Sequence, residues 1–472
     1  MTRTTRARIV GEHAVVVGAS MAGLCAARVL AERFDRVSVV DRDTFPTDPR
    51  QPRGQVPQGR HPHLLHVAGA RLLAGWFPGI VEELYDAGAV ELDLCADFYW
   101  HQEGGVARRP ETDLKGPAAS RPFLEAAVRG RVSQLSNVDV RDRCAVAGAE
   151  LVGERMTGVR LDGGALLRAD LVVDATGRPA RSLAWLRSAG YPPPPVDTVE
   201  VDTRYVTQVY RRDPSLAPGW KAAAIIDEPA TRRLAMAVPA EGERWLVVLV
   251  GLNGESPPTK PAERLAWARS LPSPVIADLM AASVPVGDAV THRFPANQRR
   301  RLDKLRRLPA GWALVGDAVC SFDPVYGQGM TSAALQVAAL GTCLDRATAI
   351  DRRFARRYHK SVSAVVAAPW SVAVGGDFAY ADTTGSKPPG NDILNRYIRR
   401  VTIAAQHDDR TAVRFNEVVA MVRRPESLLT PRFALRALRA SRQGPAPAAP
   451  TRGLGLDTTG RSPRPWVPRT RA

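Results

Sequence analysis

The chain has 472 residues, 45% of them hydrophobic, which is enough for two or more domains with full cores. It contains no apolar run of about eighteen residues, which excludes an integral membrane segment. The five cysteines form no C-x-x-C pair and indicate neither a disulfide framework nor a zinc site. The net charge of +17 raises the question of nucleic acid, but we expect no such partner, because no nucleic-acid module is present and aromatic residues do not alternate with the arginines.

Two further features bear on location and charge. The start "MTRTTRARIV" is basic but lacks the apolar core of a signal peptide, so we expect a cytoplasmic protein. One of the densest basic clusters includes "LDKLRRL" (302–308), whose leucines recur at helical spacing. This spacing predicts a helix with a solvated basic face rather than a nucleic-acid reader.

The first forty residues predict a strand, a helix and a second strand, in the βαβ order of dinucleotide-binding proteins. Gly18, Ser20 and Gly23 occupy the three positions of the G-x-G-x-x-G fingerprint. Ser20 replaces the middle glycine, but it is small and can donate to a phosphate. Asp41 follows the second strand, where an acid accepts from a ribose hydroxyl. The candidate cofactor-binding residues here are Gly18, Ser20, Met21, Ala22, Gly23, Asp41 and Arg42.

A loop rich in proline, glycine and histidine follows at 53–79 and feeds a helix predicted from about Leu64. His61, His63 and His66 raise the question of a metal, but Pro62 interrupts any helical pair and no carboxylate lies between them. We therefore expect no metal site and interpret the loop as one that presents polar groups to a cofactor or substrate. Arg60 is a candidate cofactor contact in it.

The middle of the chain alternates helices and short strands. A helix is predicted over 120–135 with Arg121 in its first turn, and a later strand ends in "DATGR" at Asp174. Between 202 and 251, four apolar stretches predict strands of a second sheet. Helical segments are predicted over 261–283. A strand near "VTHRFP" then leads toward the glycine-rich stretch at 316–330.

A second glycine-rich turn, "GDAVCSFDPVYGQGM" (316–330), follows the short buried strand "WALV" and precedes an alanine-rich helix. Gly327 and Gly329 leave backbone N–H groups exposed at the positive end of that helix, which suits a negatively charged group. The chain then looks helical until about Ala440, and the proline-, glycine- and arginine-rich remainder is predicted to be disordered.

Taken in order and spacing, "VVVGASMAGLCAARVL…VSVVDRD", "ADLVVDATGR" and "WALVGDAVCSFDPVYGQGM" resemble the FAD-dependent monooxygenases of the p-hydroxybenzoate hydroxylase class. The resemblance spans most of 13–345. It implies that the first turn holds the FAD pyrophosphate and Asp41 the adenosine ribose, that Arg121 faces FAD, and that Asp317 bonds the ribitol chain. It also implies that the loop Pro324, Gly327, Gln328, Gly329 and Met330 meets the pyrimidine end of the flavin.

The resemblance implies an α/β fold, namely a Rossmann-type FAD-binding domain with an inserted mainly β substrate domain and a helical C-terminal region. We expect the FAD-binding part over 11–198, the substrate sheet over 199–296, a return to the FAD domain over 297–345, the helical region over 346–442, and a disordered tail over 443–472. The "DATGR" motif matches a family segment associated with FAD and NADPH, although Pro179 and Ala180 replace its usual following glycine and serine.

The implied reaction uses FAD, O2 and NADPH or NADH: reduced flavin captures O2 as a C4a-hydroperoxide and one oxygen atom passes to a small lipophilic substrate. No catalytic side chain is assigned. The stretches "DRDTFPTDPR", "VPQGRHPHLL" and "APWSVAVGGDFAY" are similar to squalene-epoxidase-like enzymes of bacterial polyether antibiotic pathways, which favours epoxidation of an alkene in a polyketide or terpenoid. Aromatic-ring hydroxylation is the main alternative. A halogenase or a prenyl reductase is disfavoured, because the W-x-W-x-I-P and P-x-x-Y-x-W-x-F-P signatures are absent.

Overall fold

The computed structural model describes residues 9–54, 56–213, 219–226 and 229–446. A five-stranded parallel sheet lies at its centre, in the order β17-β11-β1-β2-β7. The strands are β1 (Gly11–Val17), β2 (Phe34–Val40), β7 (Val138–Arg141), β11 (Leu171–Asp174) and β17 (Trp312–Leu314). Parallel sheets are buried on both faces, which explains the continuous runs of valine and leucine in these strands. This sheet confirms the expected Rossmann-type α/β fold.

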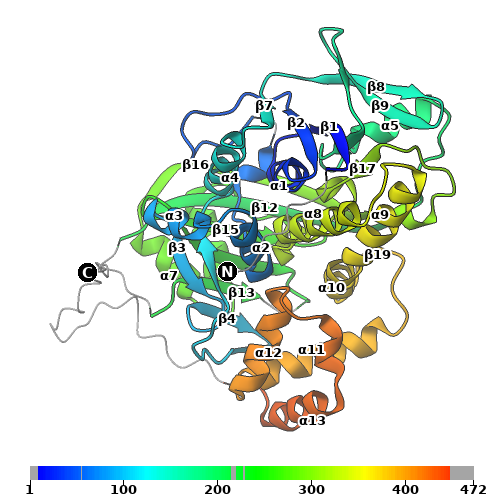
Figure 1. Cartoon of the computed structure of the whole chain (residues 1–472). Helices are drawn as coiled ribbons and strands as arrows, with labels where there is room; N and C mark the ends of the chain where they lie inside the picture. Colours follow the sequence, from blue (N-terminus) through cyan, green and yellow to red (C-terminus); the bar gives the residue numbers. More distant parts are fainter. Residues whose placement is uncertain (1–8, 55, 214–218, 227–228, 447–472) are drawn as a thin grey trace, which may run out of the picture.

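Helices cover this sheet. Helix α1 packs against α4 and α8, and α8 also packs against α2 and α9 (Figure 1). The loop before α2 contains a 3-10 turn over Pro57–Arg60, and α2 itself begins at Val67 rather than at Leu64 as predicted. The helices are α1 (Met21–Ala31), α2 (Val67–Trp76), α3 (Ile80–Asp86), α4 (Arg121–Ser133), α5 (Arg181–Ser188), α8 (Gly329–Asp345) and α9 (Arg352–Val365).

The second large sheet has nine strands, with β19 attached to β12 beside the main path β18-β16-β12-β15-β14-β13-β4-β5. It is wider than the predicted 199–296 segment, because β4 pairs in parallel with β13 and β18 pairs with β16. No strand is predicted from the sequence for the β4 region. The strands are β4 (Phe98–Gln102), β5 (Gly105–Val106), β12 (Val196–Arg211), β13 (Ala222–Ile226), β14 (Arg233–Ala240), β15 (Arg244–Gly251), β16 (Pro285–Arg300), β18 (Cys320–Ser321) and β19 (Thr384–Gly385).

Strand alternation gives this sheet two apolar faces with different neighbours. Ala235 and Leu249 point to one face, where they pack with Ile276 in a core formed with α6 (Pro261–Arg269) and α7 (Val275–Ala282). Leu234 and Val250, one residue along each strand, belong to a separate cluster on the other face. One face is therefore closed by helices, and the other is available to a cavity.

Two small sheets complete the β-structure. The three-stranded antiparallel sheet β8 (Val146–Val152), β9 (Arg155–Leu161) and β10 (Leu166–Arg168) lies at the top of Figure 1. The pair β3 (Val90–Asp93) and β6 (Lys115–Ala118) lies beside the large sheet.

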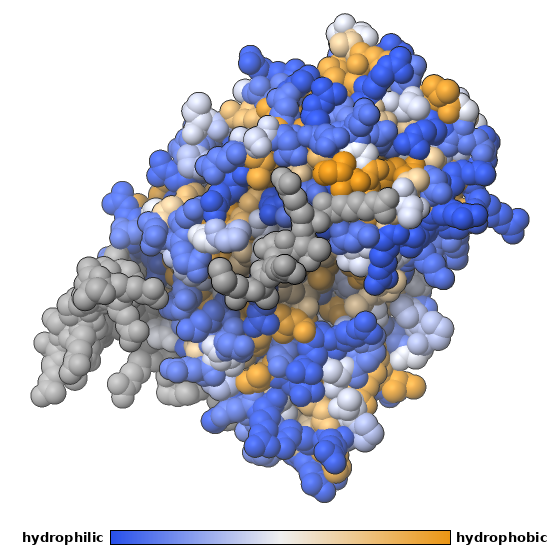
Figure 2. Space-filling model, in the orientation of Figure 1, coloured by the Kyte–Doolittle hydropathy of each residue, from blue (hydrophilic) through white to orange (hydrophobic). Residues whose placement is uncertain are grey.

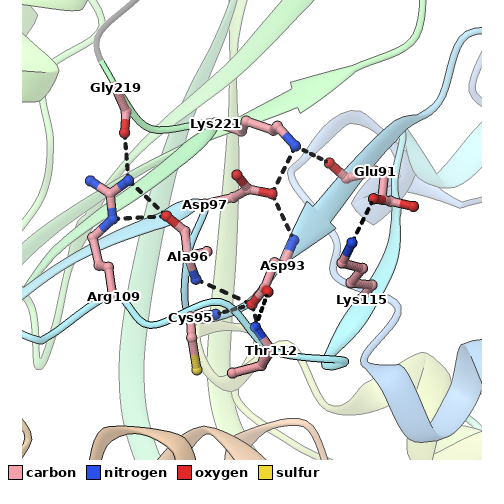
Figure 3. A network of polar contacts seen from close by, with 10 residues as sticks. All are labelled: Glu91, Asp93, Cys95, Ala96, Asp97, Arg109, Thr112, Lys115, Gly219 and Lys221. Carbon is pink, nitrogen blue, oxygen red and sulfur yellow. Dashed lines mark hydrogen bonds and ion pairs between the residues drawn. The ribbon is translucent and has the colours of Figure 1, made fainter. Parts of the chain in front are cut away.

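A polar network fixes that pair to the large sheet (Figure 3). The Asp93 carboxylate accepts from the backbone N–H groups of Cys95 at 2.8 Å and Thr112 at 2.6 Å. Asp97 accepts from the Asp93 backbone at 2.9 Å and from the Lys221 ammonium at 2.8 Å. Since Lys221 directly precedes β13 and Asp97 directly precedes β4, these bonds align the two strands that extend the sheet.

The C-terminal region is helical, as expected, and forms the lower part of Figure 1. Its helices are α10 (Ala367–Asp377), α11 (Asn391–Ala405), α12 (Asp409–Val419) and α13 (Pro431–Ala440). Of the predicted tail, 447–472 lies outside the described residues. Gly444 and Ala446 are placed: the Ala446 N–H donates to Gln406 Oε1 at 2.7 Å, and His407 Nε2 lies 2.7 Å from the Gly444 carbonyl oxygen.

The helix predicted for "LDKLRRL" is wrong. A 3-10 turn covers Leu302–Lys304, and the following residues up to 309 are irregular. Leu302 and Leu308 are both buried in the main core, so their spacing reflects two separate anchors of a loop rather than one helix face. Figure 2 shows a mainly hydrophilic surface with small apolar patches, as the charge of the chain implies. No helix within the described ranges is long and apolar enough to cross a membrane.

Candidate functional site

The first turn has the close packing that its glycines predict. Gly18 has a φ of +104°, and a Cβ there would lie 2.6 Å from the Ala175 carbonyl oxygen. A Cβ on Gly23 would lie 1.8 Å from the Gly18 carbonyl oxygen. Ser20 is the N-cap of α1 but makes no capping hydrogen bond with its side chain. The turn therefore leaves backbone N–H groups and a serine hydroxyl at the start of a helix, which is where anions bind.

Asp41 is engaged by the protein itself. One of its oxygens accepts from the Ala19 N–H at 2.6 Å and from Arg53 at 2.9 Å, and the other accepts from the Asp43 N–H at 2.9 Å. Arg53 also pairs with Glu125 at 2.8 Å, where both side chains are buried. Asp41 thus connects the fingerprint turn to the end of β2. Binding of a ribose hydroxyl by Asp41 stays a prediction, and it would use the lone pairs that these bonds leave available.

A groove runs along these residues. Its wall includes five of the predicted site residues, together with the "DATGR" turn. They are Gly18, Ser20, Asp41, Arg42 and Arg121. Met21 and Ala22 are buried behind the turn, and Arg60 is exposed and lines neither this groove nor the cavity described below.

Two aspartates at the carboxyl ends of neighbouring strands differ in their surroundings, and neither is among the residues that line the groove. Asp174, the last residue of β11, accepts from the Thr176 N–H, the Thr176 hydroxyl and the Ser182 N–H at 2.6–2.8 Å. Asp317, after β17, has a carboxylate that forms no hydrogen bond with any part of the chain that the structure describes. Burial raises the pKa of Asp317, against the opposing charges of Arg121, Arg178 and Arg300.

Backbone geometry brings the late segment close to the first turn. Gly316 has a φ of +68°, and a Cβ there would lie 2.8 Å from the Ala22 Cβ. Gly327 also has a positive φ, +63°, and Gly329 begins α8 with open space where a Cβ would be. Gln328 is buried, and its Oε1 has no partner among the described residues, whereas Met330 packs into the core.

A buried polar network that sequence analysis missed supports this loop. Asp323 accepts from the Tyr205 hydroxyl at 2.5 Å and donates its backbone N–H to Asn297 at 2.6 Å. Asn297 in turn donates to Asp377 at 2.5 Å, and Asp377 accepts from the Tyr326 hydroxyl at 2.8 Å. Burial raises the pKa of both aspartates, and the Asp323 charge raises that of Asp377 further. These partners come from distant segments, and no local pattern marks them.

A second cavity lies between this loop and the open face of the large sheet. Its lining comes from the histidine loop, from β12, β14, β15 and β16, and from the glycine loop. Gln58 lines both this cavity and the groove. The lining residues are Gln58, His61, Pro62, His63, Leu64, Tyr205, Leu234, Met236, Val248, Val250, His292, Pro324, Val325 and Gly327.

The three histidines of the loop do not converge. His61 Nδ1 lies 2.8 Å from Thr207 Oγ1, His63 Nε2 lies 3.4 Å from Arg121, and His66 Nε2 lies 3.2 Å from the Tyr326 carbonyl oxygen. Burial lowers their pKa values to about 4, 3 and 4, so all three are neutral at pH 7. No metal-binding group of three or more such side chains occurs within the described ranges.

Sequence comparison finds a relative that matches most of the chain. Protein Rv3254 of Mycobacterium tuberculosis is 35% identical over 393 residues, which cover 80% of this chain and 82% of that protein. The chain belongs to the family of Protein Rv3254. No family model matches the chain.

Solved structures show the same fold at low identity. A flavoprotein/dehydrogenase from Cytophaga hutchinsonii aligns with a TM-score of 0.64 and 15% identity, covering 91% of this chain and 98% of that one. PqsL, a probable FAD-dependent monooxygenase from Pseudomonas aeruginosa, aligns at 0.56 and 18%, covering 86% and 100%. The flavin-dependent brominase Bmp2 aligns at 0.59 and 13%, covering 91% and 93%. This member of the Rv3254 family therefore has the fold of FAD-binding flavoproteins.

Proposed function

We propose that the chain is a FAD-dependent monooxygenase that transfers one oxygen atom from O2 to a lipophilic substrate. The observation that carries the proposal is the junction of two unlike cavities at Gln58. One is a polar groove beside a dinucleotide-type turn, and the other is an apolar cavity bounded by the glycine loop. An extended cofactor can occupy the first and present its reactive end to a substrate in the second.

Unpartnered polar groups along this path fit FAD. The Asp317 carboxylate makes no hydrogen bond to a described residue, Arg121 Nε and Gln328 Oε1 are buried without a partner among those residues, and the start of α8 at Gly329 is open. Buried polar groups are normally paired, so these groups point to a ligand. The residues proposed to hold FAD are Gly18, Ser20, Met21, Ala22, Gly23, Asp41, Arg42, Arg121, Asp317, Pro324, Gly327, Gln328, Gly329 and Met330.

FAD, when bound, would supply the reduction of O2 and the transfer of one oxygen atom, with NADPH or NADH as the proposed reductant. The chain would bind and orient the reactants and exclude water. The Gly329 N–H lies at the positive end of α8 and would stabilise negative charge on the flavin ring. Leu234, Met236 and Val250 would keep the substrate end dry.

For the substrate, we propose an alkene that is epoxidised, as in a polyketide or terpenoid. The cavity wall is mostly apolar, and an isolated alkene needs no base. Hydroxylation of an aromatic ring is the second candidate, and His61 and His292 favour it because they place neutral imidazoles in the wall. A phenol must lose its proton to become reactive, and the acceptor nitrogen of a neutral imidazole can accept a hydrogen bond from its hydroxyl group. Halogenation is less favoured, because the sequence contains no W-x-W.

Product analysis tests the proposal. The purified protein should be yellow with one FAD per chain and should oxidise NADPH faster when a lipophilic polyene or phenol is added. Mass analysis should then find a product heavier by one oxygen atom. A protein that carries no flavin after reconstitution with FAD would contradict the proposal, and a ring-hydroxylated product with no epoxide would favour the second candidate.

A further inference from the structure

The apolar cavity differs from the groove in charge. The groove is lined by several ionisable side chains, among them Asp41, Arg42 and Arg181. Among the described residues that line the apolar cavity there is no aspartate, glutamate, lysine or arginine. Arg60 and Arg121 act on His61 and His63 from outside this lining. A carboxylate or ammonium group bound in the cavity would lose its water without a direct ion pair in the wall, which costs several kcal/mol. The cavity therefore suits an uncharged ligand.

Some polar groups of the cavity wall already have hydrogen-bond partners within the protein, and others do not. The Tyr205 hydroxyl donates to Asp323 at 2.5 Å, and the two ring nitrogens of His63 lie 2.9 Å from the His61 carbonyl oxygen and 3.4 Å from Arg121. His61 uses Nδ1 toward Thr207, which leaves Nε2. His292 forms no hydrogen bond with the described part of the chain.

The two available imidazoles lie side by side. The ring centroids of His61 and His292 are 5.4 Å apart, and each ring also packs near Tyr205, at 6.2 Å and 6.1 Å. They come from the loop before α2 and from β16, so the fold rather than the sequence brings them together. Burial lowers the pKa of both, and neutral imidazole carries one N–H donor and one acceptor nitrogen.

We propose that His61 and His292 are specificity-determining residues that bind a hydroxyl group of an otherwise apolar, uncharged substrate. A hydroxyl group both donates and accepts hydrogen bonds. One imidazole can therefore accept a hydrogen bond from the O–H, while the other donates its N–H to the hydroxyl oxygen. Leu234, Met236, Val248 and Val250 hold the apolar remainder. This inference adds a substrate feature to the proposed function. It rests on that function, because only a bound flavin would make this cavity the substrate site.

The test compares three probes of one shape: 1-naphthol, naphthalene and 1-naphthoate, titrated calorimetrically into the purified full-length protein. We expect 1-naphthol to bind about three- to tenfold more tightly than naphthalene, as one or two hydrogen bonds to a neutral group provide, and 1-naphthoate to bind least. His61→Phe and His292→Phe should each reduce this preference while leaving naphthalene binding within about twofold. Met236→Ala is the control, since it should weaken naphthol and naphthalene alike.

Three results would overturn the proposal: no binding of 1-naphthol, tightest binding of 1-naphthoate, or an unchanged naphthol preference in both histidine variants. None of these measurements requires turnover. If the hydroxyl preference is found in a protein that fails to oxygenate any substrate, the proposed function fails and the binding site stands.

Discussion

Asp317 and Asp174 allow the groove to be tested with a matched pair of variants. Asp174 ends strand β11 and Asp317 follows the adjacent parallel strand β17, and both are at least half buried. Asp174 accepts three hydrogen bonds, whereas the Asp317 carboxylate accepts none from a described residue. We therefore expect Asp174 to stabilise the fold and propose that Asp317 contacts the cofactor.

Asp317→Ala should weaken FAD binding by about 1–3 kcal/mol, the contribution of a hydrogen bond to a charged group. This is roughly a tenfold to hundredfold rise in Kd. The apo-protein should lose no stability. Burial raises the pKa of this carboxyl, so its ionisation opposes folding above the ordinary aspartate pKa, and its removal should leave the free energy of unfolding unchanged or raise it at pH 7.

Asp174→Ala should instead lower the free energy of unfolding by about 1–3 kcal/mol, because buried N–H groups lose their acceptor. FAD titration of the apo-proteins and urea denaturation at pH 7 measure the two quantities. Wild-type FAD affinity in Asp317→Ala would refute the assignment. Equal destabilisation by both substitutions would show that Asp317 is a structural group like Asp174.

Three further outcomes are expected. Burial lowers the pKa of His359 to about 4, so the unfolded chain binds a proton that the folded chain rejects, and this residue should contribute a loss of about 2 kcal/mol of stability between pH 7.5 and 5. The buried histidines His61, His63 and His66 add losses of the same sign, so His359→Leu should reduce the pH dependence in urea denaturation by about 2 kcal/mol without abolishing it. Gly23→Ala should abolish FAD retention, while Gly75→Ala, where a Cβ meets nothing within 4 Å, should leave flavin content unchanged. A chain ending at Gln443 should be less stable by about 1–3 kcal/mol than one ending at Ala446, because it loses two hydrogen bonds; equal melting temperatures would contradict this.

Local patterns predicted the parts of the site that depend on local geometry. Gly18 and Gly23 could be placed because a tight strand-to-helix turn forces their spacing, and the structure shows the close contacts that require them. The order of strand, aspartate and glycine loop around Asp317 was predicted for the same reason. The initial βαβ unit followed from the alternation of buried strands and helices, and the full fold class from the resemblance to FAD-dependent monooxygenases.

Contacts between distant segments could not be predicted in this way. His292 reaches the cavity from β16 only because that strand pairs with β12, and Asp377 reaches Asn297 from a separate helix. Strand β4 was missed because its partner β13 lies far along the chain. Asp41 illustrates the intermediate case, since its position was predicted but its bonds to Ala19 and Arg53 were not.

Oxygen isotope labelling tests the central claim most directly. The FAD-loaded protein is incubated with NADPH, a lipophilic hydroxylated polyene and 18O2, and the product is analysed by mass spectrometry. The account predicts a product with one added 18O atom, formed only with FAD present. An oxidised product whose oxygen comes from water, or one formed equally well without FAD, would contradict it.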